Sequence, residues 1–189
     1  MMNHFYQDIG GYCTFPAFYA YLAGQVPERG ARIVELGCAY GQSAACLAVE
    51  LINQGRSDAK VNLVDTGPQS NVEANLRPVA HIIGAYHQMD SVAAASLYAH
   101  GSLDAVFIDA DHSQSKVMQD IAAWRVKVKS GGILAGHDFT TEPGVGGVIE
   151  AVTESFDHWS VWRCSKFTNG KYYPVWWVRI GENGSEASF

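Results

Sequence analysis

The sequence predicts an α/β fold: a doubly wound, mostly parallel sheet of seven strands that ends in an antiparallel hairpin. Short apolar runs alternate with segments of helical spacing, and a glycine-containing turn joins the first run to a helix. Two β-rich segments then close the chain around an Asn-Gly step. A chain of 189 residues suits one domain. We expect that domain to span residues 1–180, followed by a disordered tail at 181–189.

Five short runs are predicted to be parallel strands, and most of them are apolar on both faces, as strands covered by helices on both sides are. They are residues 33–36, 61–65, 85–89, 104–109 and 132–136. Helical spacing follows at residues 43–54, 72–82, 92–100, 115–128 and 149–156. Repeated strand–helix units imply right-handed crossovers between parallel strands.

The two ends of the chain depart from this repeat. Residues 1–26 are predicted to form a helix whose Phe15, Phe18 and Tyr19 either cover a ligand cleft or pack as in an ordinary helix. Residues 159–167 and 172–180 are β-rich and flank an Asn-Gly step, which is a strong hairpin signal. The sheet is therefore expected to end in an antiparallel pair.

The turn after the first strand is predicted to bind a ligand. Gly37 and Gly41 remove the Cβ atoms that would block a ligand lying across the turn, and the following helix offers its N-terminus. Asp65 ends the next strand, where a carboxylate can accept two hydrogen bonds from a ribose diol. The pattern indicates a nucleoside-containing cofactor. The alternative is a turn that only joins a strand to a helix.

The spacing narrows the choice of cofactor. The dinucleotide fingerprint is G-x-G-x-x-G, whereas this turn reads G-x-x-x-G with Glu35 two residues before it. A carboxylate beside the turn would repel a pyrophosphate, but it would suit a ligand with an ammonium or sulfonium charge.

Titratable side chains also follow the fourth and fifth strands. Asp109, Asp111 and His112 end one, and His137 with Asp138 ends the other. Since these strands are neighbours in a doubly wound sheet, the side chains are expected to converge. Two carboxylates and an imidazole suit a divalent cation, which could bind a substrate oxygen and lower the pKa of its hydroxyl.

Structural alternatives exist for each of these groups. Asp111 or Ser113 could cap the next helix, and His112 could simply be solvated. His137 and Asp138 could hydrogen-bond the following loop, with Asp138 and Thr140 starting a turn. Like-charged neighbours so close together raise each other's proton affinity unless a cation or donor compensates.

These motifs resemble those of class I S-adenosylmethionine-dependent methyltransferases, and the resemblance covers roughly residues 32–149. Within that superfamily the chain is similar to the small O-methyltransferases, both the metal-dependent catechol type and the type that modifies sugars and natural products. The Ile-Asp-x-Asp-His and Gly-His-Asp-Phe motifs of this chain are closer to those of the latter type. The Rossmann-like methyltransferase fold that the resemblance implies agrees with the predicted sheet.

The resemblance implies roles for particular residues. Cofactor binding falls to Glu35, Gly37, Cys38, Ala39, Tyr40, Gly41, Ser43, Asp65, Asp90, Ser91, Asp109, Ala110 and Asp111. Asp90 and Ser91 would border the adenine, although both are also good helix caps. Asp109, His137 and Asp138 fall at the ligand positions for Mg²⁺ or another divalent cation.

His112, acting with Asp109, falls at the position of the catalytic base. The chain departs from the catechol type in two places: His112 replaces a lysine, and His137-Asp138 replaces an Asp-Asn or Asp-Asp pair. An imidazole with an ordinary pKa of about 6.5 is neutral and basic near pH 7. The expected reaction is in-line methyl transfer from S-adenosylmethionine to a small-molecule hydroxyl. The alternatives are a non-catalytic S-adenosylmethionine-binding module and a nucleotide-dependent oxidoreductase.

The composition limits the classes of binding partner that we expect. The net charge is −6 with no basic cluster, so a nucleic-acid footprint is not evident. No apolar window is long enough to cross a membrane. Four cysteines without C-x-x-C pairing fit a reducing cytoplasm. The aromatic C-terminal segments could serve a homo-oligomer interface, although sheet core is the alternative.

Overall fold

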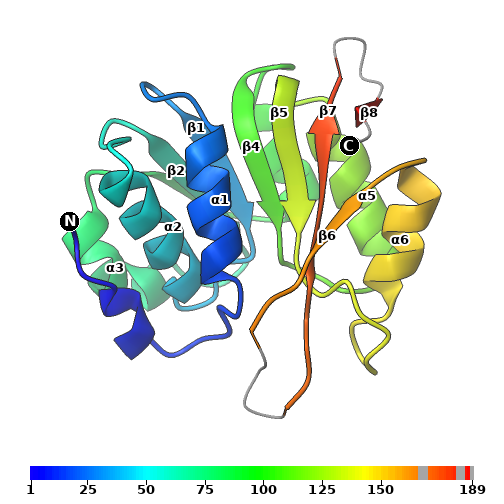
Figure 1. Ribbon diagram of the computed structural model, residues 1–189, viewed down its shortest axis with the longest axis horizontal. Coiled ribbons are helices and arrows are strands. Elements are labelled where there is room, and N and C mark those ends of the chain that lie inside the picture. The colour runs from blue at the N-terminus through cyan, green and yellow to red at the C-terminus, as the bar shows by residue number, and fades with distance from the viewer. Residues whose placement is uncertain (166–169, 182–185, 188–189) are drawn as a thin grey trace.

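The computed structural model describes residues 1–165, 170–181 and 186–187. Its central feature is one sheet with the strand order β3-β2-β1-β4-β5-β7-β6 (Figure 1). The strands are β1 Arg32–Leu36, β2 Lys60–Asp65, β3 Ile83–Gln88, β4 Leu103–Ile108, β5 Val128–Gly136, β6 Ser160–Trp162, β7 Val175–Ile180 and β8 Glu186–Ala187. Strand β8 pairs with the end of β7.

The pairing confirms the predicted fold class. Strands β3, β2, β1, β4 and β5 are parallel neighbours, whereas β7 runs antiparallel to both β5 and β6. The closing antiparallel pair is therefore present, although Asn169 of the predicted hairpin turn lies outside the described residues. So does most of the expected disordered tail, from which residues 186–187 form β8.

The helices are α1 Pro16–Gln25, α2 Gln42–Asn53, α3 Ser70–Leu76, α4 Ser91–Ala94, α5 Gln114–Arg125 and α6 Gly147–Ser155. Short 3₁₀ turns lie at η1 Phe5–Asp8, η2 Arg77–Val79 and η3 Ala95–Leu97. Three predicted helices were too long. The one expected at 115–128 ends at Arg125, and Val128 already belongs to β5. The helix expected at 72–82 ends at Leu76, because Pro78 has no N–H to continue it. The helix expected at 92–100 ends as an α-helix at Ala94 and continues only as the 3₁₀ turn η3.

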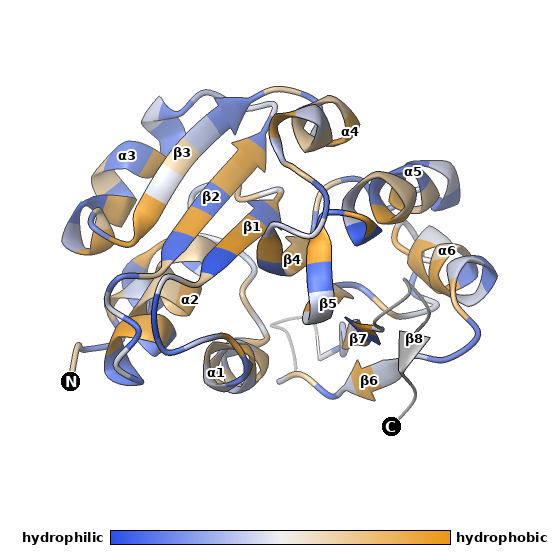
Figure 2. Ribbon diagram, turned by 90° about the horizontal axis from the view of Figure 1, so that it is seen from above, coloured by the Kyte–Doolittle hydropathy of each residue, from blue (hydrophilic) through white to orange (hydrophobic). Residues whose placement is uncertain are grey.

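Helices cover both faces of the sheet, and the two layers are seen from above in Figure 2. Side chains of the central strands alternate between two cores. Ile33 and Phe107 pack into the core with α1 and α2, while Val34 and Val106 pack into the core with α5 and α6. All four side chains are fully buried, as expected for strands that are apolar on both faces.

The N-terminal prediction was wrong in part. The helix begins only at Pro16, because a residue that precedes proline is pushed away from helical backbone angles. Phe15, Phe18 and Tyr19 are buried, and their rings lie 4.9, 6.0 and 4.9 Å from the Phe107 ring. These side chains pack in the core. The segment is therefore an ordinary packing helix, and these three side chains do not cover the ligand cleft.

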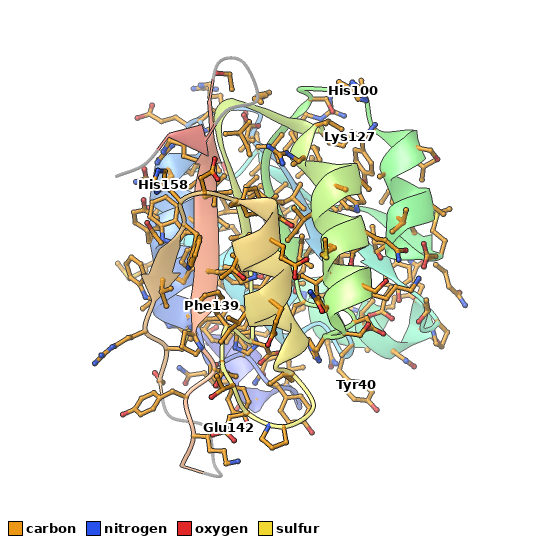
Figure 3. All side chains as sticks on the ribbon, turned by 90° about the vertical axis from the view of Figure 1, so that its right-hand side faces the viewer. Tyr40, His100, Lys127, Phe139, Glu142 and His158 are labelled. Atoms are coloured by element: carbon orange, nitrogen blue, oxygen red, sulfur yellow. The ribbon has the colours of Figure 1, made fainter. Side chains whose placement is uncertain are left out.

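The parallel strands β1, β2, β4 and β5 all end at one edge of the sheet. Figure 3 shows Tyr40 and Phe139, which follow β1 and β5, at the same end of the molecule as Glu142, with His100 and Lys127 at the opposite end. The loops that carry the predicted site therefore lie together. Among the helices of the described residues, none combines the length and apolarity needed to span a bilayer.

Candidate active site

The glycine turn lies tightly between two strand ends. Gly37 and Gly41 have φ angles of +79° and +84°, which glycine adopts without strain. A Cβ atom on Gly37 would lie 2.0 Å from the Asp109 carbonyl oxygen, and the Gly37 N–H donates to the Val64 carbonyl at 2.8 Å. The turn after β1 is thus packed directly against the backbone that follows β4.

Asp65 holds this turn in place. Its Oδ2 accepts hydrogen bonds from the backbone N–H groups of Cys38 and Ala39, both at 2.9 Å, and its Oδ1 accepts one from Gly67 at 2.8 Å. Ala39 lies at a φ of +45°, an uncommon angle for a residue with a Cβ. The carboxylate assigned to a ribose diol therefore also fixes the backbone beside it.

Asp90 and Ser91 begin α4. The Asp90 Oδ1 accepts from the Ala93 N–H at 3.1 Å, so the capping alternative is correct for this residue. The Ser91 hydroxyl donates to Oδ1 of Asp120 at 2.5 Å. Burial raises the pKa of Asp120 to about 6, although the Ser91 hydrogen bond opposes the rise. Lys116 Nζ lies 3.5 Å from Asp90 Oδ2.

Two histidines and two aspartates converge where β4 and β5 end. His112 Nε2 lies 2.8 Å from Asp138 Oδ2 and 3.6 Å from Asp109 Oδ1. His137 Nδ1 lies 3.3 Å from Asp138 Oδ1 and 3.6 Å from Asp109 Oδ1. Because β4 and β5 are paired, with Ile108 opposite Gly136, the residues that follow both strands become neighbours. The expected convergence is present.

Of the purely structural roles considered for these residues, only the backbone turn at Asp138 is present. A tight turn does begin at Asp138, since the Thr140 N–H donates to its carbonyl at 2.7 Å and its φ is +59°. Its carboxylate nevertheless faces both histidines. Asp111 accepts from the N–H and hydroxyl of Ser113, and neither side chain caps α5. His112 is paired with carboxylates rather than simply solvated.

The charges of this cluster shift one another's pKa values. The carboxylates of Asp109 and Asp138 beside the ring raise the pKa of His112 to about 10. Burial opposes protonation of His137, but Asp109 and Asp138 outweigh it and raise the pKa to about 10. Burial likewise opposes ionisation of both aspartates, yet the histidines hold their pKa values below the usual range.

The two carboxylates beside the ring favour the protonated form of His112. This differs from the expectation of an ordinary imidazole, because two carboxylates face the ring. The donor set also fits a cation: ligand atoms of Asp109, His137 and Asp138 lie within 4.8 Å of one another. These are the three residues predicted from the sequence.

A cavity of about 630 Å³ joins the glycine turn to this cluster. That volume is typical of sites for small organic ligands. The predicted residues that line it are Gly37, Cys38, Ala39, Tyr40, Ser43, Asp65, Asp90, Ser91, Asp109, Ala110, Asp111, His112, His137 and Asp138. Glu35 and Gly41 are not among the lining residues.

Other lining residues were missed by sequence reasoning: Gly11, Tyr12, Cys13, Thr14, Gln42, Val64, Thr66, Met89, Lys116 and Tyr173. Residues 11–14 precede α1 and are held there by Gln42, whose Oε1 accepts from the Cys13 N–H at 2.9 Å and whose Nε2 donates to the Ile9 carbonyl at 2.8 Å. No periodicity or spacing in the sequence signals this contact.

The comparisons identify the family of the chain. The model of a methyltransferase domain family matches residues 34–139, which is more than half of the chain. The match begins within β1 and ends just past β5, so it contains every residue that was predicted for the cofactor and cation sites. The chain belongs to this family. No curated protein matched the sequence of this methyltransferase domain.

Solved structures share the fold of the methyltransferase domain. One is titled an SAM-dependent O-methyltransferase from Thermotoga maritima (19% identity, 89% of this chain and 66% of that one, TM-score 0.65). Another is the O-methyltransferase TomG from Streptomyces achromogenes (17%, 92% and 83%, TM-score 0.69). A third is a putative rRNA-methylase from Clostridium thermocellum (16%, 90% and 99%, TM-score 0.65). The chain spans just under two thirds of the Thermotoga protein.

Glu35 of the methyltransferase domain lies behind the glycine turn rather than in the cavity. Its side chain is fully buried, and the Ser43 hydroxyl donates to its Oε1. Burial raises its pKa to about 8, assisted by the carboxylates of Asp109 and Asp65 and opposed by the Ser43 hydrogen bond. Glu35 and Asp109 were both assigned to cofactor binding, and of these two carboxylates only Asp109 lines the cavity.

As pH rises, we expect the wild type to lose stability because of Glu35, and we expect Glu35→Gln to abolish this loss. An unfolded glutamate has a pKa near 4.3, so between that value and about 8 the folded state retains a proton that the unfolded state has lost. The stabilising contribution is complete below the lower value and disappears as pH rises through the upper one. Relative to the variant, the wild-type free energy of unfolding should fall by about 1 kcal/mol per pH unit across that window.

Urea unfolding at several pH values measures this difference. Glu28→Gln, at an exposed glutamate, is the matched control and should give a difference that does not change with pH. A pH-independent difference for Glu35→Gln as well would mean that Glu35 is ionised throughout.

Proposed function

We propose that this methyltransferase transfers the methyl group of S-adenosylmethionine to a hydroxyl oxygen of a small-molecule acceptor. One observation carries the proposal: a single cavity connects the glycine turn with the His–Asp cluster. A donor and an acceptor held at these two ends would meet inside it. Much of the rate acceleration would come from holding the two reactants in line.

The donor half of the cavity offers groups suited to the parts of S-adenosylmethionine. The N-terminus of α2 would attract the methionine carboxylate. The N–H groups of Cys38 and Ala39 and the Ser43 hydroxyl already donate to Asp65 and Glu35. Asp65 would accept from the ribose hydroxyls, Asp90 and Ser91 would border the adenine, and Asp109 would face the ammonium group. TomG, which shares the fold, is described in complex with SAM, and this supports the choice of donor.

The acceptor half contains the groups for proton removal. His112 lies at the more exposed side of the cluster, with 32% of its side chain exposed, against 6% for His137. It is therefore the more accessible imidazole of the two, although its Nε2 atom is itself buried beside the carboxylates. To take the hydroxyl proton it must be neutral, which requires that Asp109 and Asp138 no longer stabilise its protonated form. The likeness to a protein titled an SAM-dependent O-methyltransferase supports oxygen as the nucleophile.

The residues present fit a divalent cation. Asp109, His137 and Asp138 supply two carboxylates and one imidazole close enough to share one ion, and such a donor set binds divalent metals. When bound, the ion would supply Lewis-acid chemistry by lowering the pKa of a coordinated hydroxyl. The two carboxylates that it would engage are the same ones that raise the pKa of His112.

Calorimetric titration with S-adenosylhomocysteine tests the donor assignment, and NAD⁺ is the matched control ligand. We expect S-adenosylhomocysteine to bind with a micromolar dissociation constant and NAD⁺ to give no heat. Folded protein that ignores S-adenosylhomocysteine at millimolar concentration would contradict the proposal, while binding of NAD⁺ instead would favour an oxidoreductase. Turnover with a panel of phenols and sugars, with and without a divalent cation, then separates an enzyme from a non-catalytic binding module.

A further inference from the structure

We propose that Thr14, which lies outside the matched domain and before α1, is a positioning residue for the cation site, and that the imidazole it orients makes the site select a transition-metal ion such as Co²⁺ over Mg²⁺. This inference rests on the cation site of the proposed function. It adds a residue from another part of the chain and a class of metal.

The two ring nitrogens of His137 face different partners. Nδ1 points to the carboxylates, 3.3 Å from Asp138 Oδ1 and 3.6 Å from Asp109 Oδ1. Nε2 lies on the other side of the ring, 3.1 Å from the Thr14 hydroxyl oxygen. Only Nδ1 is therefore directed at the place where the two carboxylates converge.

The contact between Thr14 and His137 is buried and held from several sides. Thr14 is 8% exposed and His137 is 7% exposed. The Phe15 ring packs 4.6 Å from the imidazole, and the Ser165 N–H donates to the Thr14 carbonyl at 3.1 Å. The hydroxyl is thus placed by a fixed backbone, and the ring has little room to turn.

This geometry selects one form of the imidazole for metal binding. A cation at the carboxylates needs the lone pair of Nδ1, so the proton of the neutral ring must reside on Nε2. There it donates to the Thr14 oxygen, the one hydrogen-bond partner that the described residues give this nitrogen. Such outer contacts fix the orientation of a histidine ligand, and their loss typically costs about 10- to 100-fold in metal affinity.

The ligand types determine the class of metal. Mg²⁺ prefers oxygen ligands throughout, whereas imidazole suits later first-row ions. Asp109 and Asp138 alone would not distinguish these ions strongly. The nitrogen of His137 does, and it can do so only while the ring is held with Nδ1 toward the carboxylates.

The experiment measures Co²⁺ binding to tag-free protein by calorimetry and visible absorption, with Mg²⁺ as competitor and with no methyl donor present. Thr14→Val keeps the side-chain shape and removes the hydroxyl, and Thr14→Ser keeps the hydroxyl. Thr66→Val is the matched control, since Thr66 also lines the cavity but no hydrogen bond joins it to His137 among the described residues. His137→Asn removes the nitrogen ligand.

We expect Thr14→Val to weaken Co²⁺ binding about 10- to 100-fold, while Thr14→Ser and Thr66→Val bind like the wild type. In His137→Asn the preference for Co²⁺ over Mg²⁺ should shrink at least about tenfold. Thermal unfolding verifies that each variant is folded, and Thr14→Ala replaces any Thr14→Val protein that is not.

Three results would overturn the inference: wild-type Co²⁺ affinity in Thr14→Val, an unchanged metal preference in His137→Asn, or no Co²⁺ binding by the wild type. An absorption band of cobalt–thiolate coordination would also overturn it, because Cys13 lines the same cavity. None of these results affects S-adenosylhomocysteine binding, so failure here is distinguishable from failure of the proposed function.

Discussion

Replacement of Gly37 by alanine is expected to lower the free energy of unfolding by roughly 2 to 5 kcal/mol, from left-handed strain and forced overpacking together. The new Cβ would lie 2.0 Å from the carbonyl oxygen and 2.6 Å from the carbonyl carbon of Asp109, and 2.8 Å from the Ala110 Cα. All three are backbone atoms, so no side chain can rotate away. Either the turn after β1 or the segment after β4 must move.

Donor binding should fail in the same variant, because the displaced segments carry both the glycine turn and Asp109. Gly131→Ala is the matched control. Gly131 has a φ of +78°, almost the angle of Gly37, but a Cβ atom there meets nothing within 4 Å. It should therefore show only the conformational strain, about 1 to 2 kcal/mol. Urea unfolding and S-adenosylhomocysteine titration compare the two variants, and equal losses of stability would mean that the close approach at Gly37 is not real.

Much of the fold could be predicted from local features of the sequence. The strand bounds came within a few residues, because each central strand is a short apolar run bounded by polar or glycine residues. The helix ends were less predictable, although Pro78 and Pro16 carried usable signals. Proline disfavours helix for the residue before it and cannot continue one itself, which explains the short α3 and the late start of α1.

The candidate site was predictable where it depends on topology. Residues that follow neighbouring parallel strands must meet at one edge, so Asp109, His137 and Asp138 could be placed together from their positions alone. Thr14 could not be, because nothing local ties it to a strand that ends 122 residues later, at Gly136. That contact depends on how the N-terminal segment packs.

Glu35 shows a different limit. It lies inside β1, between the buried residues Val34 and Leu36, and strand side chains point to the faces of the sheet rather than along its edge. The carboxylate is therefore directed into the core behind the turn. The alternation of the strand indicates this orientation, but the resemblance to a cofactor motif favoured the opposite interpretation.

Substitution of His112 by alanine is expected to reduce turnover by about 10²- to 10⁴-fold, the usual contribution of a positioned acid–base group. His112 is the more exposed histidine of the cluster and lies 2.8 Å from Asp138 Oδ2. Among the described residues its ion pairs are with Asp109 and Asp138, and none joins it to the glycine turn or to Asp65. Affinity for S-adenosylhomocysteine should thus stay close to that of the wild type.

Two further variants distinguish proton transfer from a general loss of structure. His112→Lys places another titratable amine beside Asp138, as in the catechol-type enzymes that the motif resembles, and should recover part of the lost turnover. His100→Ala removes an exposed histidine at the opposite end of the molecule (Figure 3) and should have no effect. Turnover is measured as S-adenosylhomocysteine formed with a hydroxyl acceptor that the wild type methylates. Wild-type turnover in His112→Ala would show that this imidazole takes no part in the reaction. The acceptor proton would then have to pass to a carboxylate or to solvent.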